Sequence, residues 1–122
     1  CRVFTAEVAT AAPFAASLAA GIPTTVEYQP SWVDGIGSKG VFPQMFDRAR
    51  NLVDGALTAE LSGVASALRH LVQHNHIVAE GAGACPVACA LSGSAGRGKI
   101  VCIISGGNLD PTKLAQILTA SF

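Results

Sequence analysis

Charge is scarce in this sequence. Only 13% of its 122 residues are charged, whereas a soluble domain usually carries roughly 25%. The 8 basic residues balance the 8 acidic ones, and no basic stripe is present. These features argue against nucleic acid and anionic membrane as partners. Because half of the residues are apolar, we expect the chain to bury part of its exterior against the remainder of a larger protein or against a second chain.

The sequence also lacks long apolar runs and metal-type cysteine pairs. No apolar run approaches the roughly 20 residues that a membrane-spanning helix needs, and no signal-peptide pattern is present. Four cysteines occur, at Cys1, Cys85, Cys89 and Cys102, without a CxxC pair. This usage favours the reducing cytoplasm over a disulfide framework. The chain opens inside a strand-like run without an initiator Met, so we expect residues 1–122 to be a single segment of a longer protein.

What is present alternates between strand-like and helix-like segments. Composition and turn residues predict a strand, a short Ala-rich helix, a second short strand, a long loop, a helix and another short strand, over residues 2–8, 13–20, 24–28, 29–40, 41–51 and 52–57. The longest helix follows over 59–75, with Thr58 as its N-cap and Glu60 near its positive end. Its apolar stripe has helical spacing and consists of Leu61, Val64, Ala65, Leu68, Leu71 and Val72.

The C-terminal part continues the alternation. The small-residue run over 81–93 predicts a packed helix that begins near Cys85, because Pro86 fits only in a first turn. Residues 99–104, apolar after Lys99, are expected to form a strand, and Asp110 with Pro111 is expected to open a last helix. A strand that is apolar on both faces is typical of a parallel sheet covered by helices. The sequence therefore predicts an α/β fold, with a layered sheet of mainly parallel strands and flanking helices.

Two glycine-rich stretches are candidate ligand-binding segments. The sequence SGGNLD, residues 105–110, lies where ligands bind in parallel sheets, at the carboxyl end of a strand. Its glycines allow close backbone approach or positive φ, although a plain tight turn explains the same letters. The sequence AEGAGA, residues 79–84, places Glu80 before small residues. These letters alone favour close helix–sheet packing over ligand approach.

Histidine and cysteine pairs at helical spacing favour structural roles. His70 and His74 are four residues apart and off the apolar stripe, without a third ligand of defined spacing. We interpret them as a solvated face rather than a zinc or nickel site. Cys85 and Cys89 share that spacing, and we expect both to be buried as small hydrophobes. No catalytic triad can be assigned, and no lysine lies where a buried Schiff-base lysine is expected.

Three landmarks in order give a more specific indication. SWVDGIG at 31–37, VAEGAGA at 78–84 and IISGGNLD at 103–110 resemble the C-terminal part of the threonine/serine dehydratase family. These are fold-type II enzymes dependent on pyridoxal phosphate, and serine racemase is one of them. The strand RVFTAEV is similar to a family strand that carries an acidic residue at the position of Glu7. The resemblance covers nearly all of this chain but only about the last third of the family's catalytic chain.

The resemblance implies a cofactor site but no catalytic residue in this chain. Ser105 matches the serine that hydrogen-bonds the pyridine nitrogen, and Gly106, Gly107 and Asn108 match the turn that holds it. Gly35 matches a loop glycine against the cofactor, and Glu80 an acidic residue near the ring. The Schiff-base lysine segment, the substrate-carboxylate loop and the phosphate loop of the family have no counterpart here.

Metal binding is not expected from the same comparison of motifs. Some members bind a divalent cation near the strand that carries the acidic residue matched by Glu7. Ala11 matches a further position of that cation-binding segment. Pro13 stands where a second acidic residue is needed. We therefore expect no metal in this chain.

The resemblance implies the C-terminal portion of the large domain of a lyase. The complete enzyme is expected to deaminate L-threonine or L-serine to a 2-oxo acid and ammonia by β-elimination. It is expected to be cytoplasmic and homo-oligomeric, with serine or threonine as substrate, and this chain alone is expected to be inactive. A serine racemase-like enzyme, another fold-type II enzyme and a non-catalytic α/β assembly module remain alternatives.

Overall fold

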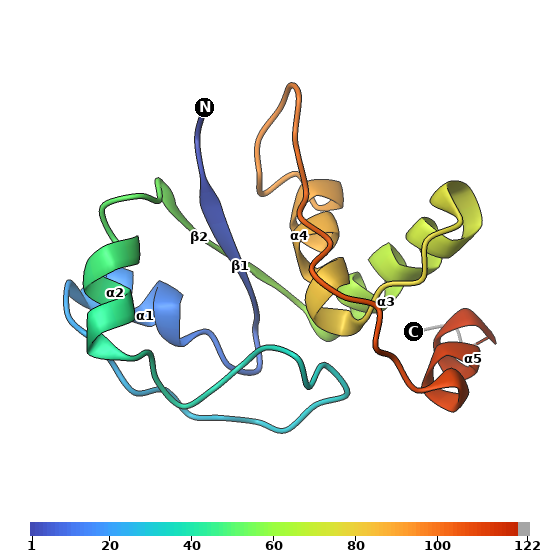
Figure 1. Ribbon diagram of the computed structural model, residues 1–122, viewed down its shortest axis with the longest axis horizontal. Helices are drawn as coiled ribbons and strands as arrows, with labels where there is room; N and C mark the ends of the chain where they lie inside the picture. The colour runs from blue at the N-terminus through green and yellow to red at the C-terminus, as the bar shows by residue number, and fades with distance from the viewer. Residues whose placement is uncertain (120–122) are drawn as a thin grey trace.

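The computed structural model describes residues 1–119, in which two parallel strands lie between two groups of helices (Figure 1). Helices α1 and α2 lie on one side of the strands, and α3 and α4 on the other. In chain order the elements are β1 (Phe4–Val8), α1 (Pro13–Ala20), α2 (Pro43–Ala49), β2 (Gly55–Ala59), α3 (Leu61–His70), a π-helical turn (Leu71–Asn75), α4 (Gly81–Leu91) and α5 (Pro111–Thr119). The predicted α/β class with parallel strands and flanking helices is confirmed.

The pairing of β1 with β2 fixes the register of the first half of the chain. Phe4 lies opposite Gly55 and Val8 opposite Ala59. Parallel neighbours require a long crossover, and the segment containing α1 and α2 supplies it. The carboxylate of Glu7 accepts hydrogen bonds from the backbone N–H groups of Phe14 (2.9 Å) and Ala15 (2.8 Å). Because the first N–H groups of a helix have no partner within it, Glu7 joins the end of β1 to the start of α1.

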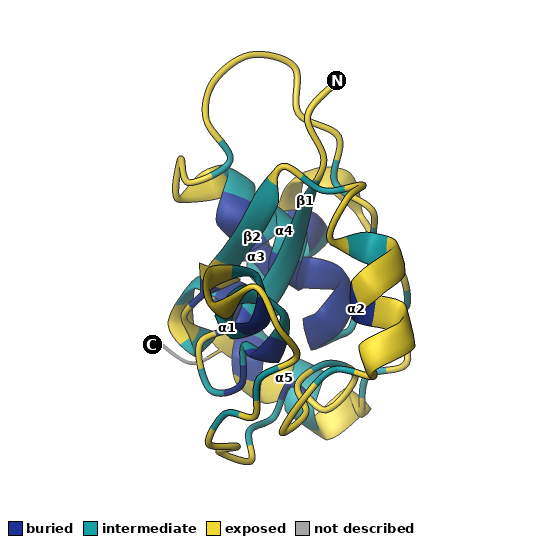
Figure 2. Ribbon diagram, turned by 90° about the vertical axis from the view of Figure 1, so that its left-hand side faces the viewer, coloured by how far each residue is buried: buried dark blue, intermediate teal, exposed yellow. Residues whose placement is uncertain are grey.

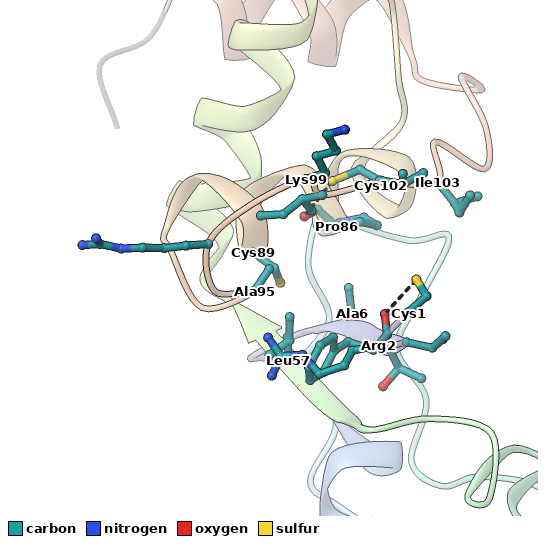
Figure 3. Close-up of a pocket in the computed structure, with 16 residues that line it drawn as sticks. Cys1, Arg2, Ala6, Leu57, Pro86, Cys89, Ala95, Lys99, Cys102 and Ile103 are labelled. Carbon is teal, nitrogen blue, oxygen red and sulfur yellow. Dashed lines mark hydrogen bonds between the residues drawn. The ribbon is translucent and has the colours of Figure 1, made fainter.

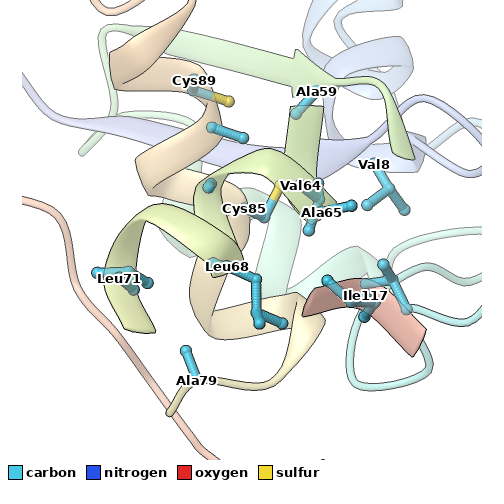
Figure 4. Packing of buried hydrophobic residues seen from close by; sticks show 14 residues of the cluster. Val8, Ala59, Val64, Ala65, Leu68, Leu71, Ala79, Cys85, Cys89 and Ile117 are labelled. Atoms are coloured by element: carbon cyan, nitrogen blue, oxygen red, sulfur yellow. The ribbon is translucent and has the colours of Figure 1, made fainter. Parts of the chain in front are cut away.

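The core lies where α3 packs on α4 and both strands. Figure 2 shows the buried residues concentrated in these two helices, and Figure 4 shows Val64, Leu68 and Cys85 packed together with Ile117 from α5. The predicted apolar stripe is confirmed along α3 and the π-helical turn that follows it, since four of its members are buried and the other two pack against the cluster. Cys85 and Cys89 are also buried, as predicted.

Several predicted boundaries are wrong, each for a local reason. Thr58 is not an N-cap, because it belongs to β2; the N-cap of α3 is Glu60, whose side chain makes no capping hydrogen bond. Helix α4 begins at Gly81 rather than near Cys85, so Pro86 lies inside the helix. The Asp110 cap is confirmed, since Lys113 N–H donates to Oδ1 at 3.0 Å.

Two predicted strands do not form in residues 1–119. Residues 24–28 contain no strand; their link to the next turn is a hydrogen bond from Val26 N–H to Lys39 O at 2.8 Å. Residues 99–104 are extended but pair with no neighbouring strand. None of the helices in the described part of the chain combines the length and the apolar character that crossing a membrane requires.

Candidate functional site

The extended segment that ends at the SGGN turn meets the first turn of α4. The backbone N–H of Glu80 donates to the carbonyl of Gly106 at 3.0 Å. Glu80 is the N-cap residue of α4 and has extended dihedral angles, so the chain turns from one element into the other at this point. The hydrogen bond therefore joins the two glycine-rich candidate segments, residues 79–84 and 105–110, which are separated by more than twenty residues.

Backbone-to-backbone contact explains two glycines at this junction. A Cβ built on Gly83 would come within 2.8 Å of the Gly106 carbonyl oxygen. One built on Gly107 would come within 2.7 Å of the carbonyl oxygen of Val78. Real Cβ atoms do not approach so closely, and neither glycine has positive φ. These glycines are therefore required for close approach, one of the two roles that glycine can play in such a turn.

The Glu80 carboxylate lies between two more of the predicted site residues. A Cβ on Gly106 would overlap Oε1 of Glu80, and a Cβ on Gly35 would lie 3.5 Å from the same oxygen. Gly35 also faces Ala82, whose Cβ would be 3.0 Å away. The structure thus brings Gly35, Glu80 and Gly106 together around one carboxylate.

The loop that carries Gly35 is held against α4 by apolar contacts. A Cβ on Gly81 would come within 2.8 Å of a methyl group of Val33 and within 3.1 Å of the ring of Trp32. Val33 is buried in the core, and Trp32 packs against it. The 31–37 loop therefore packs on Gly81, and the SGGN turn packs on Gly83. Two glycines spaced two residues apart at a helix start are the sequence signal of these two contacts.

Ser105 and Asn108 border this cluster and are exposed. Within residues 1–119 neither side chain makes a hydrogen bond. The Ser105 hydroxyl is therefore free to bind a polar group at the open side of the junction. The structure places Asn108 beyond the junction, toward α5, and gives its amide no partner among the described residues.

Acidic and histidine groups outside this cluster have other roles. Glu7, matched by resemblance to a cation-binding position, accepts two amide hydrogen bonds of α1 instead, a role that the sequence did not reveal. The rings of His70 and His74 lie with their centroids 4.5 Å apart and their planes tilted by 51°. His74 is exposed and His70 is half-buried. No group of three metal-ligating side chains is found within residues 1–119.

The buried cysteines of α4 are electrostatically paired. A hydrogen bond from the Cys85 thiol lowers the pKa of Cys89 to about 7, because it stabilises the Cys89 thiolate. The same pairing, together with burial, raises the pKa of Cys85. Cys89 is 1% exposed. The two cysteines lie about one and a half and two and a half turns along α4 from Glu80, so they take no part in the cluster at the helix start.

The chain matches the family model described as "Pyridoxal-phosphate dependent enzyme" over residues 1–106. It is 36% identical over 118 residues to the biosynthetic L-threonine dehydratase of Mycobacterium leprae, covering 94% of this chain and 28% of that protein. It is also 36% identical over 104 residues to the L-threonine ammonia-lyase of Thermotoga maritima, covering 84% of this chain and 26% of that one. This chain thus spans about a quarter of the length of these relatives.

Solved structures show the same architecture. The T.th. threonine deaminase superposes with a TM-score of 0.82 at 31% identity, covering 89% of this chain and 40% of that chain. Maize serine racemase superposes with a TM-score of 0.82 at 28% identity, covering 94% of this chain and 37% of that one. The fold and the order of its elements are therefore those of these larger proteins.

Proposed function

Because the chain belongs to the family of pyridoxal-phosphate-dependent enzymes, we propose that it forms the C-terminal portion of a catalytic domain that deaminates L-threonine or L-serine. The observation that carries the proposal is the junction at which Gly35, Glu80 and Gly106 meet beside an unpaired Ser105 hydroxyl. Identities of 36% to two threonine-deaminating relatives support the choice of substrate class.

The residues at the junction fit the cofactor that the family description names. Gly35 and Gly106 leave room for the Glu80 side chain, and Ser105 presents a hydroxyl that can give or accept one hydrogen bond. The backbone of Glu80 is fixed to Gly106, and its carboxylate lies beside Gly35 and Gly106. We propose that Ser105 binds the pyridine nitrogen, that Gly106, Gly107 and Asn108 hold the turn, and that Gly35 and Glu80 lie beside the ring.

A serine at the ring nitrogen suits elimination. When bound, pyridoxal phosphate supplies an electron sink for the bonds at the α-carbon of an amino acid. A hydroxyl partner leaves the ring nitrogen near neutral, whereas a carboxylate would favour its protonated form. With Ser105 as its partner, the ring would withdraw electrons less strongly than a protonated ring. This favours rapid loss of the substrate's β-hydroxyl over prolonged proton exchange at the α-carbon. The overall products are a 2-oxo acid and ammonia.

The remaining groups of the site must come from outside these residues. Lys39 and Lys99 are exposed, and Lys113 lies in the first turn of α5. We therefore propose that this chain alone holds no covalently bound cofactor and is inactive. Mixing it with pyridoxal phosphate, reducing with borohydride and mapping the product should give no single stoichiometric lysine adduct. One such adduct on Lys39, Lys99 or Lys113 would contradict this.

The proposed activity is tested in the full-length protein that contains these residues. With pyridoxal phosphate present, L-threonine and L-serine should yield 2-oxo acid and ammonia in equal amounts. The proposal fails if neither amino acid yields 2-oxo acid while the cofactor is bound. D-threonine is a matched control, because it has the same functional groups with the α-proton on the opposite face.

Racemisation of serine is a second candidate, favoured by one observation. Maize serine racemase gives the same TM-score, 0.82, as the T.th. threonine deaminase. Solvent deuterium incorporation at the α-carbon of recovered serine, compared with 2-oxo acid formed, separates the two activities. A protein that converts L-serine into an equal mixture of L- and D-serine, with little 2-oxo acid, is a racemase.

A further inference from the structure

The end of helix α3 carries two histidines whose rings lie close together and have no hydrogen-bond partner among the described residues. His70 is the last residue of α3, and His74 lies in the π-helical turn that continues it. Their ring centroids are 4.5 Å apart, and neither imidazole makes a hydrogen bond within residues 1–119. A neutral imidazole has one nitrogen that accepts a proton or a metal ion. The pair therefore offers two nitrogen ligands at one place on the surface.

The separation of the two rings matches that of two imidazoles bound to one metal ion. Two rings that share an ion at nearly a right angle, each through a nitrogen at about 2.0–2.1 Å, have their centroids roughly 4.5 Å apart. The ring planes are tilted by 51°, so the rings do not form a face-to-face stack, in which their nitrogens would not point to one ion. Ligands at right angles are typical of the square-planar or tetragonal geometry of Ni²⁺ and Cu²⁺, whereas zinc prefers tetrahedral angles.

The surroundings of the pair leave room for an ion and its water ligands. His74 is exposed and His70 is half-buried, and Figure 1 shows this yellow end of α3 projecting away from the two strands. The neighbouring positive charge of Arg69 is directed to α5, where its guanidinium donates to the carbonyl of Ile117 at 3.0 Å. The C-terminal end of a helix carries partial negative charge, which favours a cation near these two rings.

The π-helical turn is a second observation at the same place. The Leu71 carbonyl accepts the backbone N–H of His76 and, at 3.1 Å, that of Ile77. His76 ends the turn with a φ of 57°, a left-handed conformation that is unfavourable for residues other than glycine. Turns of this kind are rare in proteins and are often found at functional sites. The turn therefore points to a function at this end of α3 independently of the distance between the rings.

We propose that His70 and His74 bind one divalent ion of the Ni²⁺ or Cu²⁺ class, with water completing its coordination. The sequence favours a solvated face because it contains no third ligand of defined spacing, and no group of three metal-ligating side chains is found within residues 1–119. A tetragonal ion that keeps its water needs only these two rings. The ion would join α3 to the π-helical turn, and so restrain the segment that leads to Val78, whose carbonyl oxygen packs against Gly107.

Cysteine thiols bind the same ions, so the test must separate them from the histidines. Cys1, Cys89 and Cys102 line a groove of about 480 Å³, shown in Figure 3, and no histidine lines it. Cys1 is exposed, whereas Cys89 is buried. All measurements are therefore made on the full-length protein that contains these residues, without a histidine tag and with Cys1→Ser as the parent.

Nickel binding is measured by calorimetry on the parent and on two histidine variants. Loss of even an outer-shell partner of a metal costs about 10–100-fold in affinity, so His74→Ala, which removes a ligand at an exposed position, should weaken binding at this site at least tenfold. His76→Asn is the matched control, because it removes a neighbouring exposed imidazole while asparagine tolerates positive φ. It should leave nickel binding unchanged.

Amide hydrogen exchange followed by mass spectrometry locates the ion. Ni²⁺ should slow exchange over residues 71–77 at least tenfold in the parent, have no effect there in His74→Ala, and leave residues 43–49 of α2 unchanged. Mg²⁺ should have no effect on residues 71–77, because it prefers oxygen ligands.

Four results would overturn the proposal. They are unchanged exchange over residues 71–77 with Ni²⁺, equal protection by Mg²⁺, nickel binding by His74→Ala as tight as that of the parent, and a loss in His76→Asn as large as that in His74→Ala. None of these readouts is catalytic, and the proposal does not rest on the proposed activity, so failure of that activity would leave it unaffected.

Discussion

The carboxylate of Glu80 lies against the α-carbon of Gly106, and the backbone N–H of Glu80 donates to the carbonyl of Gly106 at 3.0 Å. One residue therefore fixes the SGGN turn through its main chain and occupies the space over it with its side chain. A side chain at position 106 would compete with Glu80 for that space. The two residues are thus expected to depend on each other when either is changed.

Alanine substitutions at the two glycines of the turn should separate stability from site geometry. Gly107→Ala would overlap the backbone oxygen of Val78, which cannot move away without shifting the chain, so it should lower the free energy of unfolding by about 1–3 kcal/mol. Gly106→Ala would overlap the flexible Glu80 side chain and should cost less. Urea denaturation of the 122-residue chain measures both.

A double-mutant cycle then tests the dependence of the two residues. The Gly106→Ala change should cost less stability when combined with Glu80→Ala than when made alone, with a coupling energy of about 0.5–3 kcal/mol. Additive effects would mean that the two side-chain positions do not compete.

Changes at Ser105 should alter the reaction catalysed by the full-length protein. Ser105→Ala removes one neutral hydrogen bond, about 0.5–1.5 kcal/mol net, so cofactor affinity should fall about 2- to 13-fold and elimination should slow without stopping. Ser105→Asp should raise the pKa of the ring nitrogen and increase α-proton exchange relative to elimination. The ratio of 2-oxo acid formed to α-proton exchanged measures this. An unchanged ratio and cofactor spectrum in Ser105→Asp would place Ser105 away from the ring nitrogen.

Removing the Glu7 carboxylate should loosen α1. Glu7→Ala leaves the N–H groups of Phe14 and Ala15 without their side-chain partner, and the loss of such a cap costs about 0.5–2 kcal/mol. The midpoint of urea unfolding should therefore fall. Glu27→Ala is the matched control, because Glu27 is exposed and makes no hydrogen bond within residues 1–119. Equal effects of the two changes would exclude a capping role for Glu7.

The cap of α5 should lose its effect in acid. Hydrogen bonds from the backbone N–H groups of Lys113 and Thr112 hold the pKa of Asp110 below its usual value of 3.8. Because the folded-state pKa is the lower one, the stabilisation is present above about pH 4 and is lost as the pH falls through the folded-state value. Urea unfolding of the wild-type chain and Asp110→Ala should therefore differ at pH 7, and the difference should disappear once the pH lies below the folded-state pKa. A difference that persists in acid would contradict the assignment.

Local sequence patterns predict those helices and strands whose start and end residues lie within the element itself. The sequence predicts strand β1 closely because β-branched residues favour a strand there. It predicts helix α1 closely because Pro13 begins the helix and Gly21 ends it. Thr58 was misassigned because a hydroxyl residue before a helix is equally acceptable as the end of a strand. Helix α4 begins at Gly81, a poor helix former, because Val33 and Trp32 pack on the space that glycine leaves.

The candidate site depended more on resemblance than on pattern. The residues of 105–110 and of 79–84 are each compatible with a plain turn or close packing as well as with a ligand site. Only their order along the chain indicates that both belong to one site. The contact between Gly83 and Gly106 lies between segments distant in sequence, so no local rule reveals it. The strand predicted over 99–104 failed to pair for the same kind of reason, since a strand is completed by a neighbour, and the described residues do not contain one.

The junction of Gly83 with Gly106 and of Gly107 with Val78 brings main chains together with no side chain between them. The spacing at such a contact is set by atoms that all amino acids share. Mutational drift in the surrounding core can therefore proceed without moving the SGGN turn, provided that the glycines persist. A site built in this way can be inherited by descendants that differ widely in sequence, and its position should vary less among them than the side chains that surround it.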